Sequence, residues 1–321
     1  MSEREGKVGA IKLEPIFVER IWGGTWLRDE FGFDLPSSRI GEGWAISAHK
    51  SGDCRISLGK YKGLSLSQIY DRRRDLFAND SRAAFPLIVK LIDAKDDLSI
   101  QVHPDDGYAR EHENQSGKSE AWVILRAGAN AKIQIGHNAA TTADLRQMVS
   151  EGKWQRLLNF RPLAEGEVID IPSGTIHAIC AGTSLIEIQQ ASDLTYRLYD
   201  YDRVDDHGKK RELHIQKALD VIDVPQRAKS ISLMPKKPSK NVASLLLATP
   251  NFDIYILDVE GRYRFDNPHR NYYLATILEG RGKIGRIAVA KGDSLVITSA
   301  FASTQMRGDM RIIYSDPKVR N

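Results

Sequence analysis

The stretch Gly166-Glu-Val-Ile-Asp-Ile-Pro-Ser-Gly-Thr-Ile-His177 has the most specific residue spacing in the chain. Apolar, β-branched residues at 168–171 predict a strand, and the Pro-Ser-Gly triplet that follows predicts a tight turn. The turn places His177 at the start of the next expected strand. A histidine delivered by a strand–turn–strand unit is a candidate metal ligand in a β-rich protein.

The rest of the sequence consists largely of short strand-like runs separated by glycine turns, such as residues 85–89, 121–125 and 185–188. Three segments have helical spacing of apolar residues, at 66–77, 142–158 and 213–221. Many short strands with few helices predict a mainly β protein, built as a sandwich or barrel with helical insertions.

A proline-, serine- and lysine-rich stretch predicts a linker at residues 229–240, between domains at 1–228 and 241–321. The second half repeats part of the spacing around His177. Ser303 stands eleven positions after Gly292, where the repeat would have a histidine. We interpret the chain as a duplicated barrel whose second copy has lost its metal ligands.

Two further pairs of residues have the alternation of a strand. Gln101 and His103 are two apart, so on a strand they share a face, and the same holds for Lys118 and Glu120. A buried carboxylate at Glu120 needs a positive partner, which either Lys118 or a metal cation could supply. Two histidines, a carboxylate and an amide oxygen suit a borderline divalent ion, with zinc first.

Taken together, these motifs resemble those of the cupin superfamily and, within it, the mannose-6-phosphate isomerase family in its compact bacterial form. The resemblance extends from about Leu13 to Val221 and is most specific at residues 85–90 and 99–105, with support at 21–24, 117–122, 172–177 and 196–203. It implies a cupin (jelly-roll) β-barrel followed by a degenerate cupin-like β-domain. It also implies one Zn²⁺ per chain, bound by Gln101, His103, Glu120 and His177.

The resemblance also implies an activity, the interconversion of mannose 6-phosphate and fructose 6-phosphate through an enediol. Arg197 falls on the essential arginine of the family, although an interior ion pair with Asp200 or Asp202 is an alternative interpretation. Lys118 and Glu187 are both candidates for proton transfer, and the sequence does not choose between them. Ser99, Lys90 and Arg203 are candidates for binding the phosphate.

Composition limits the other function classes. Hydrophobic residues make up 41% of the chain and the formal net charge is +4, with no long basic stripe interleaved with aromatics, so nucleic-acid binding is not expected. No apolar run is long enough to cross a bilayer, and the N-terminus lacks the apolar core of a secretion signal. We therefore expect a cytoplasmic protein. The family resemblance implies a phosphorylated hexose as its partner, and we expect a monomer or weak homo-oligomer.

Three alternatives remain from the sequence. An iron-dependent cupin oxygenase is disfavoured by Gln101 and by the segment around Arg197. A sugar-binding or regulatory protein with two cupin domains is disfavoured by the intact set of four ligands. An isomerase of a different sugar phosphate is the hardest of the three to exclude.

Overall fold

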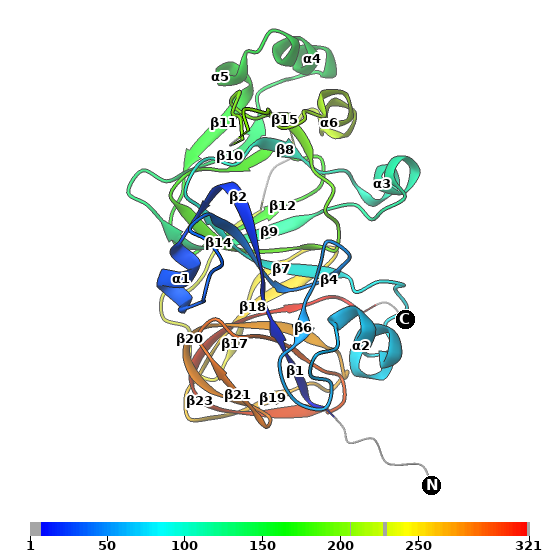
Figure 1. Cartoon of the computed structure of the whole chain (residues 1–321), viewed down its shortest axis with the longest axis vertical. Coiled ribbons are helices and arrows are strands. Elements are labelled where there is room, and N and C mark those ends of the chain that lie inside the picture. The colour runs from blue at the N-terminus through cyan, green and yellow to red at the C-terminus, as the bar shows by residue number, and fades with distance from the viewer. Residues whose placement is uncertain (1–7, 206, 227–229, 320–321) are drawn as a thin grey trace.

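The computed structural model describes residues 8–205, 207–226 and 230–319. Strands account for 44% of the residues and helices for 15%, which confirms the predicted mainly β fold. Figure 1 shows two barrels along the long axis of the molecule, with a group of helices at the far end of the upper one.

Two antiparallel sheets face each other in the upper barrel. Within the described residues, the larger of these two sheets has seven strands in the order β16 (Ile231–Leu233), β12 (Glu167–Ile171), β9 (Glu120–Ala127), β14 (Thr183–Gln190), β7 (Leu87–Ala94), β3 (Ile40–Ile46) and β2 (Ile16–Gly24). The smaller sheet has five, in the order β11 (Leu158–Pro162), β10 (Lys132–His137), β13 (His177–Ile179), β8 (Ile100–Val102) and β15 (Tyr196–Tyr199).

The central strands of the seven-stranded sheet are buried on both faces. In β14, Leu185 packs inside the upper barrel with Trp122, whereas Ile186 packs against the apolar junction with the lower barrel. Every residue of β7 is buried, which explains why these strands read as continuous apolar runs instead of alternating ones. Charged side chains on the inner face, Lys90 and Glu187, are therefore exceptions that need partners.

The lower barrel is one sheet that curls on itself (Figure 1). Its nine strands within the described residues follow the order β17 (Ala243–Ala248), β18 (Asp253–Val259), β23 (Ser303–Asp316), β20 (Tyr273–Ile284), β22 (Ser294–Ile297), β1 (Ala10–Glu14) and β6 (Arg55–Ile56), with β19 (Arg262–Asp266) beside β23 and β21 (Ile287–Ala290) beside β20. A separate two-stranded ribbon joins β4 (Ala48–His49) and β5 (Gly52–Asp53).

The lower barrel includes strands from both ends of the chain. β1 pairs with β22 from Ala10↔Ile297 to Leu13↔Ser294, and the ammonium of Lys12 lies 2.6 Å from the carboxylate of Asp293. Within the predicted linker, β16 pairs with β12 of the upper barrel. The predicted division into residues 1–228, 229–240 and 241–321 stays a prediction.

Short helices cover the outer surfaces of the barrels. They are α1 (Trp26–Phe31), α2 (Leu66–Arg72), the 3₁₀ helix η1 (Arg74–Phe77), α3 (Asp106–Glu113), α4 (Thr142–Ser150), α5 (Trp154–Leu157) and α6 (Ile215–Val221). The helix predicted at 142–158 is interrupted, because Gly152 adopts a φ of 63°. The helix predicted at 66–77 also divides in two, at Arg73. No helix of the described ranges is long and apolar enough to cross a membrane.

Candidate metal centre and active site

Three buried side chains converge between the two sheets of the upper barrel. His103 follows β8, Glu120 begins β9 and His177 begins β13, and one ligand atom from each lies within 4.8 Å of the others. The two carboxylate oxygens of Glu120 lie 3.3 Å from Nε2 of His177 and 3.4 Å from Nε2 of His103. Ligands bound tetrahedrally to zinc at about 2.0–2.1 Å lie about 3.4 Å apart, so the cluster has the right size for this ion.

The turn before His177 builds one wall of the cluster. Gly174 has a φ of 79°, and its N–H donates to the carbonyl of His103 over 2.9 Å. A Cβ atom on Gly174 would lie 2.8 Å from the carboxyl carbon of Asp223, so both space and backbone conformation require glycine. The turn thereby sets His177 opposite Gln101 in the β13–β8 pairing.

Backbone carbonyls orient both imidazole rings. Nδ1 of His103 lies 2.8 Å from the carbonyl oxygen of Leu194, and Nδ1 of His177 lies 3.0 Å from that of Thr175. Each carbonyl favours a proton on Nδ1, so each Nε2 keeps its lone pair directed at the cluster. This is the arrangement that metal-binding histidines require.

The charge state of the cluster also suits a cation. Burial alone would raise the pKa of Glu120, but the ammonium of Lys118 and the two imidazoles hold it well below its usual value. Burial and the ammonium of Lys118 lower the pKa of His103 to about 3. Oε2 of Glu120 accepts no hydrogen bond of regular geometry, although Nζ of Lys118 lies 2.8 Å away. A buried, ionised carboxylate beside the neutral imidazole of His103 fits a divalent metal ion.

Gln101 is placed to add a fourth ligand. Its side-chain Nε2 lies 3.4 Å from Nε2 of His177. A half-turn about the Cγ–Cδ bond of Gln101 exchanges the amide nitrogen and oxygen, and would place Oε1 where Nε2 now lies. The four residues predicted as ligands therefore lie together.

A cavity of about 470 Å³ adjoins the cluster through Gln101 and Lys118. Six residues from the sequence-based prediction line it: Lys90, Ser99, Gln101, Lys118, Glu187 and Arg197. Arg20, Glu42 and Arg211 line it too, and sequence reasoning did not find them.

Charged side chains form a row across the inner face of the seven-stranded sheet. Glu42 receives hydrogen bonds from Arg20 over 2.6 Å and from the indole of Trp44 over 2.7 Å. Nζ of Lys90 lies 3.6 Å from Glu42 and 3.5 Å from Glu187. Glu42 and Trp44 are two apart on β3, so the alternation rule that grouped the other pairs could have found them.

The two carboxylates of this row have opposite pKa shifts. Burial alone would raise the pKa of Glu42, but Lys90, Arg20 and the hydrogen bond from Trp44 lower it to about 2. Burial and the nearby charge of Glu120 raise the pKa of Glu187, although Lys118 and Lys90 oppose them. Glu187 is therefore the carboxylate that more readily takes up a proton.

The two predicted arginines occupy different places. Arg197 lines the cavity, and its guanidinium donates to Oγ of Ser99 over 3.3 Å and to the carbonyl of Glu212 over 2.8 Å. Asp200 instead pairs with Arg203 and Arg211, and Asp202 pairs with Lys210. Among the described residues, the ion pair considered for Arg197 therefore does not form with either carboxylate. Arg203 is not among the cavity-lining residues of the described chain.

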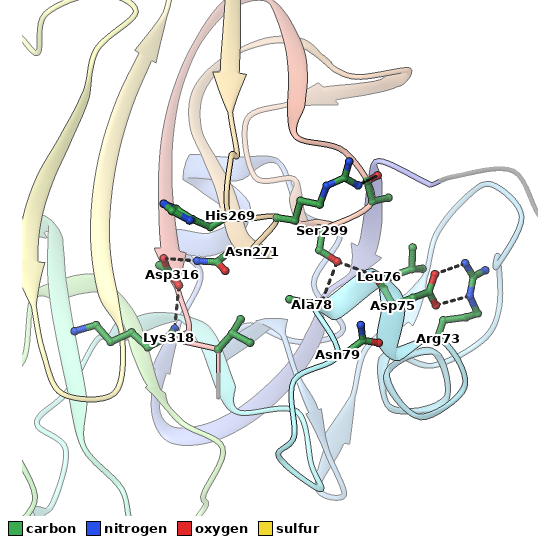
Figure 2. Close-up of a pocket in the computed structure, with 13 residues that line it drawn as sticks. Arg73, Asp75, Leu76, Ala78, Asn79, His269, Asn271, Ser299, Asp316 and Lys318 are labelled. Atoms are coloured by element: carbon green, nitrogen blue, oxygen red, sulfur yellow. Dashed lines mark hydrogen bonds and ion pairs between the residues drawn. The ribbon is translucent and has the colours of Figure 1, made fainter. Parts of the chain in front are cut away.

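A larger hollow of about 630 Å³ lies at the junction of the barrels (Figure 2). Several of its polar side chains pair with one another, as Arg73 does with Asp75 and Asn271 with Asp316 (Figure 2). The candidate metal cluster of His103, Glu120 and His177 lies beside the cavity of about 470 Å³, so we assign function to that cavity.

Comparison with known proteins agrees with this geometry. A family model described as phosphomannose isomerase type I, catalytic domain, matches residues 10–121. A mannose-6-phosphate isomerase of Streptococcus mutans is 41% identical over 94% of this chain and 98% of its own length. The chain belongs to the mannose-6-phosphate isomerase family. Members of this family are aldose–ketose isomerases.

Solved structures of the family share the whole fold. The crystal structure of the mannose 6-phosphate isomerase from Bacillus subtilis superposes with a TM-score of 0.90 at 37% identity, over 96% of this chain and 99% of that one. A phosphomannose isomerase variant from Salmonella typhimurium has a TM-score of 0.78 at 16% identity, over 97% of this chain and 100% of its own, a likeness of fold alone. The cupin-like fold expected from the sequence is thus confirmed.

Proposed function

We propose that this protein interconverts mannose 6-phosphate and fructose 6-phosphate and uses one zinc ion bound by Gln101, His103, Glu120 and His177. The observation that supports this most directly is the buried His103–Glu120–His177 cluster beside a charged cavity, in a member of this family. Zinc bound there would act as a Lewis acid that stabilises negative charge developing on the sugar oxygens.

Residues around the cavity are placed to transfer the protons and to bind the substrate. The reaction removes a proton from C2 of the aldose and returns one to C1, with a matching proton transfer between O1 and O2, so no atoms are gained or lost. Glu187 is the better candidate for the carbon proton, because its pKa is raised and its carboxylate lines the cavity. The pKa of Lys118 lies above its usual value, because Glu120 and Glu187 outweigh the effect of burial. Its ammonium is therefore suited to stabilising an oxygen.

Arg197 is suited to orienting the sugar and to balancing charge on the enediolate. Arg197 pairs with Gln101 across β15 and β8, so it lies next to a proposed metal ligand. Two protein acceptors, Ser99 and the carbonyl of Glu212, hold its plane in place. Ser99 and Lys90, both cavity-lining, remain candidates for contact with the phosphorylated end of the substrate.

A coupled assay on zinc-loaded protein tests this function. Fructose 6-phosphate formed from mannose 6-phosphate would be measured beside parallel reactions with other aldose phosphates. We expect mannose 6-phosphate to give the highest kcat/KM. Faster turnover of a different sugar phosphate would transfer the assignment to that substrate. Bound zinc without turnover of any sugar phosphate would contradict the enzyme assignment.

A further inference from the structure

Two arginines pair with one carboxylate at the edge of the cavity, and a third arginine stands beside them. Nε of Arg211 donates to Oδ2 of Asp200 over 2.8 Å, and Arg211 also donates to Oδ1. Arg203 donates to Oδ1 of the same carboxylate over 2.6 Å. Arg197 stands next to this group, since its guanidinium donates to the carbonyl of Glu212, the residue after Arg211.

The cluster has an excess of positive charge. Asp200 is buried and shared by two guanidinium groups, whereas the side chain of Glu212 is 82% exposed and its charge is largely screened by water. Burial and the guanidinium of Arg211 lower the pKa of Arg197, as expected where like charges crowd together. An anion bound here would relieve this repulsion.

Two of the three arginines have unused donors. Arg211 uses Nε and Nη2 on Asp200, and Arg197 uses Nε and Nη1 on Ser99 and Glu212. Nη1 of Arg211 and Nη2 of Arg197 have no partner among the described residues, and both side chains line the cavity. Arg203 does not line the cavity, and its other two hydrogen bonds go to the backbone carbonyls of Asp97 and Asp200.

Lys90 is a poorer site for a dianion. Its ammonium lies between the carboxylates of Glu42 and Glu187, at 3.6 and 3.5 Å. A phosphate placed there would meet two carboxylates as well as one cation. In a hexose 6-phosphate the reacting carbons and the phosphate lie at opposite ends, so a phosphate site away from the metal ligands is needed. Arg197 connects Gln101 to the loop that carries Arg211.

We propose that Arg211 is a substrate-binding residue that holds the phosphate of the sugar phosphate at the part of the cavity next to Arg197, and that Arg203 is a positioning residue that acts on Arg211 through Asp200. This inference rests on the proposed function for the identity of the substrate, while the anion site itself rests on the arginine cluster. It changes the expectation from sequence, in which Arg203 contacted the phosphate directly.

The direct test is calorimetric binding of sorbitol 6-phosphate, which has no carbonyl group and cannot isomerise, to the zinc-loaded protein. We expect Arg211→Met to raise its Kd about tenfold or more, because a charge-assisted hydrogen bond to phosphate is lost. Arg211→Lys keeps the positive charge but loses the planar pair of N–H donors, so its Kd should lie between those of Arg211→Met and the native protein. Unphosphorylated sorbitol serves as the ligand control.

Matched variants separate the role of Arg203 from that of Arg211. Arg203→Met should raise the Kd less than Arg211→Met does, and Arg203→Lys should restore it, because a lysine can still pair with Asp200. Arg262→Met, on an exposed residue of β19 in the lower barrel, should change nothing. Zinc content should stay the same in every variant. A Kd unchanged by Arg211→Met, or raised more by Arg203→Met, would overturn the proposal.

Kinetics separates this inference from the proposed function. If the native protein isomerises mannose 6-phosphate, Arg211→Met should raise KM more than it lowers kcat. An unaltered KM would contradict the role of Arg211 in phosphate binding and would leave the proposed function standing. If the native protein has no isomerase activity but binds sorbitol 6-phosphate through Arg211, the proposed function fails and the anion site is supported.

Discussion

The ammonium of Lys118 lies 2.8 Å from Oε2 of Glu120, inside the group of residues that would bind the metal. Both side chains are buried, and the sequence had offered either Lys118 or a metal cation as the partner of this carboxylate. The structure allows both, since Glu120 also reaches the two histidines with its oxygens at 3.3 and 3.4 Å. Lys118 and a metal ion then repel each other.

Replacement of Lys118 by methionine should tighten zinc binding and reduce turnover. Loss of the ammonium removes its repulsion of the ion and leaves Glu120 without compensation in the metal-free protein, and both effects favour the bound state. We expect the zinc Kd, measured by competition with a chelator, to fall about tenfold or more. Weaker zinc binding in Lys118→Met would mean that the ammonium supports the loaded site instead.

His177→Ala should abolish stoichiometric metal binding. The imidazole supplies Nε2 to the cluster and is held by the carbonyl of Thr175, whereas the side chain of alanine has no atom that can bind a metal. Metal analysis after dialysis should drop from about one zinc per chain to near zero, and activity should drop with it. The matched control is His269→Ala, an exposed histidine at the barrel junction, which should keep its zinc. Zinc retained in His177→Ala would refute the ligand assignment.

Arg197→Lys should retain zinc and lose most of its turnover. The guanidinium reaches Ser99 and the carbonyl of Glu212 with two different nitrogens, and a single ammonium cannot hold both while facing the substrate. We expect kcat to fall by about a hundredfold, near 2.7 kcal/mol of transition-state stabilisation. Full activity of this variant at unchanged zinc content would remove Arg197 from the reaction.

Glu42 should make stability depend on pH in the acid range. Its pKa is about 2 in the folded protein and 4.5 ordinarily, so its contribution is complete above pH 4.5 and is lost as the pH falls towards 2. The free energy of unfolding in urea should differ between the native protein and Glu42→Gln by on the order of 3 kcal/mol at pH 7. That difference should shrink below pH 4.5. A difference independent of pH would show that Glu42 does not act through its charge.

Local spacing accounts for the part of the site that could be predicted. Within Gly166–His177, the strand, the turn and the position of the histidine all depend on residues adjacent in sequence. The alternation of side chains along a strand likewise placed Gln101 and His103 on one face. Arg211 could not be found in this way. It lies outside any strand or helix, and its position depends on the buried carboxylate of Asp200.

The fold shows the same division between local and distant determinants. Strand type and the mainly β class follow from composition, but the pairing of β1 with β22 has no signal near either strand. Helix ends were less predictable, because Gly152 and Arg73 interrupt segments whose apolar spacing continues past them.

The pairing of β1 with β22 has a consequence for the order of events during synthesis. Lys12 and its partner Asp293 are 281 residues apart in the chain, so β1 leaves the ribosome long before β22 exists. Until β22 emerges, β1, which carries the apolar residues Ile11 and Leu13, can pair only with the short strand β6. We expect slow folding with a late closing step, and a nascent chain that depends on chaperones to keep this early strand from pairing with other chains.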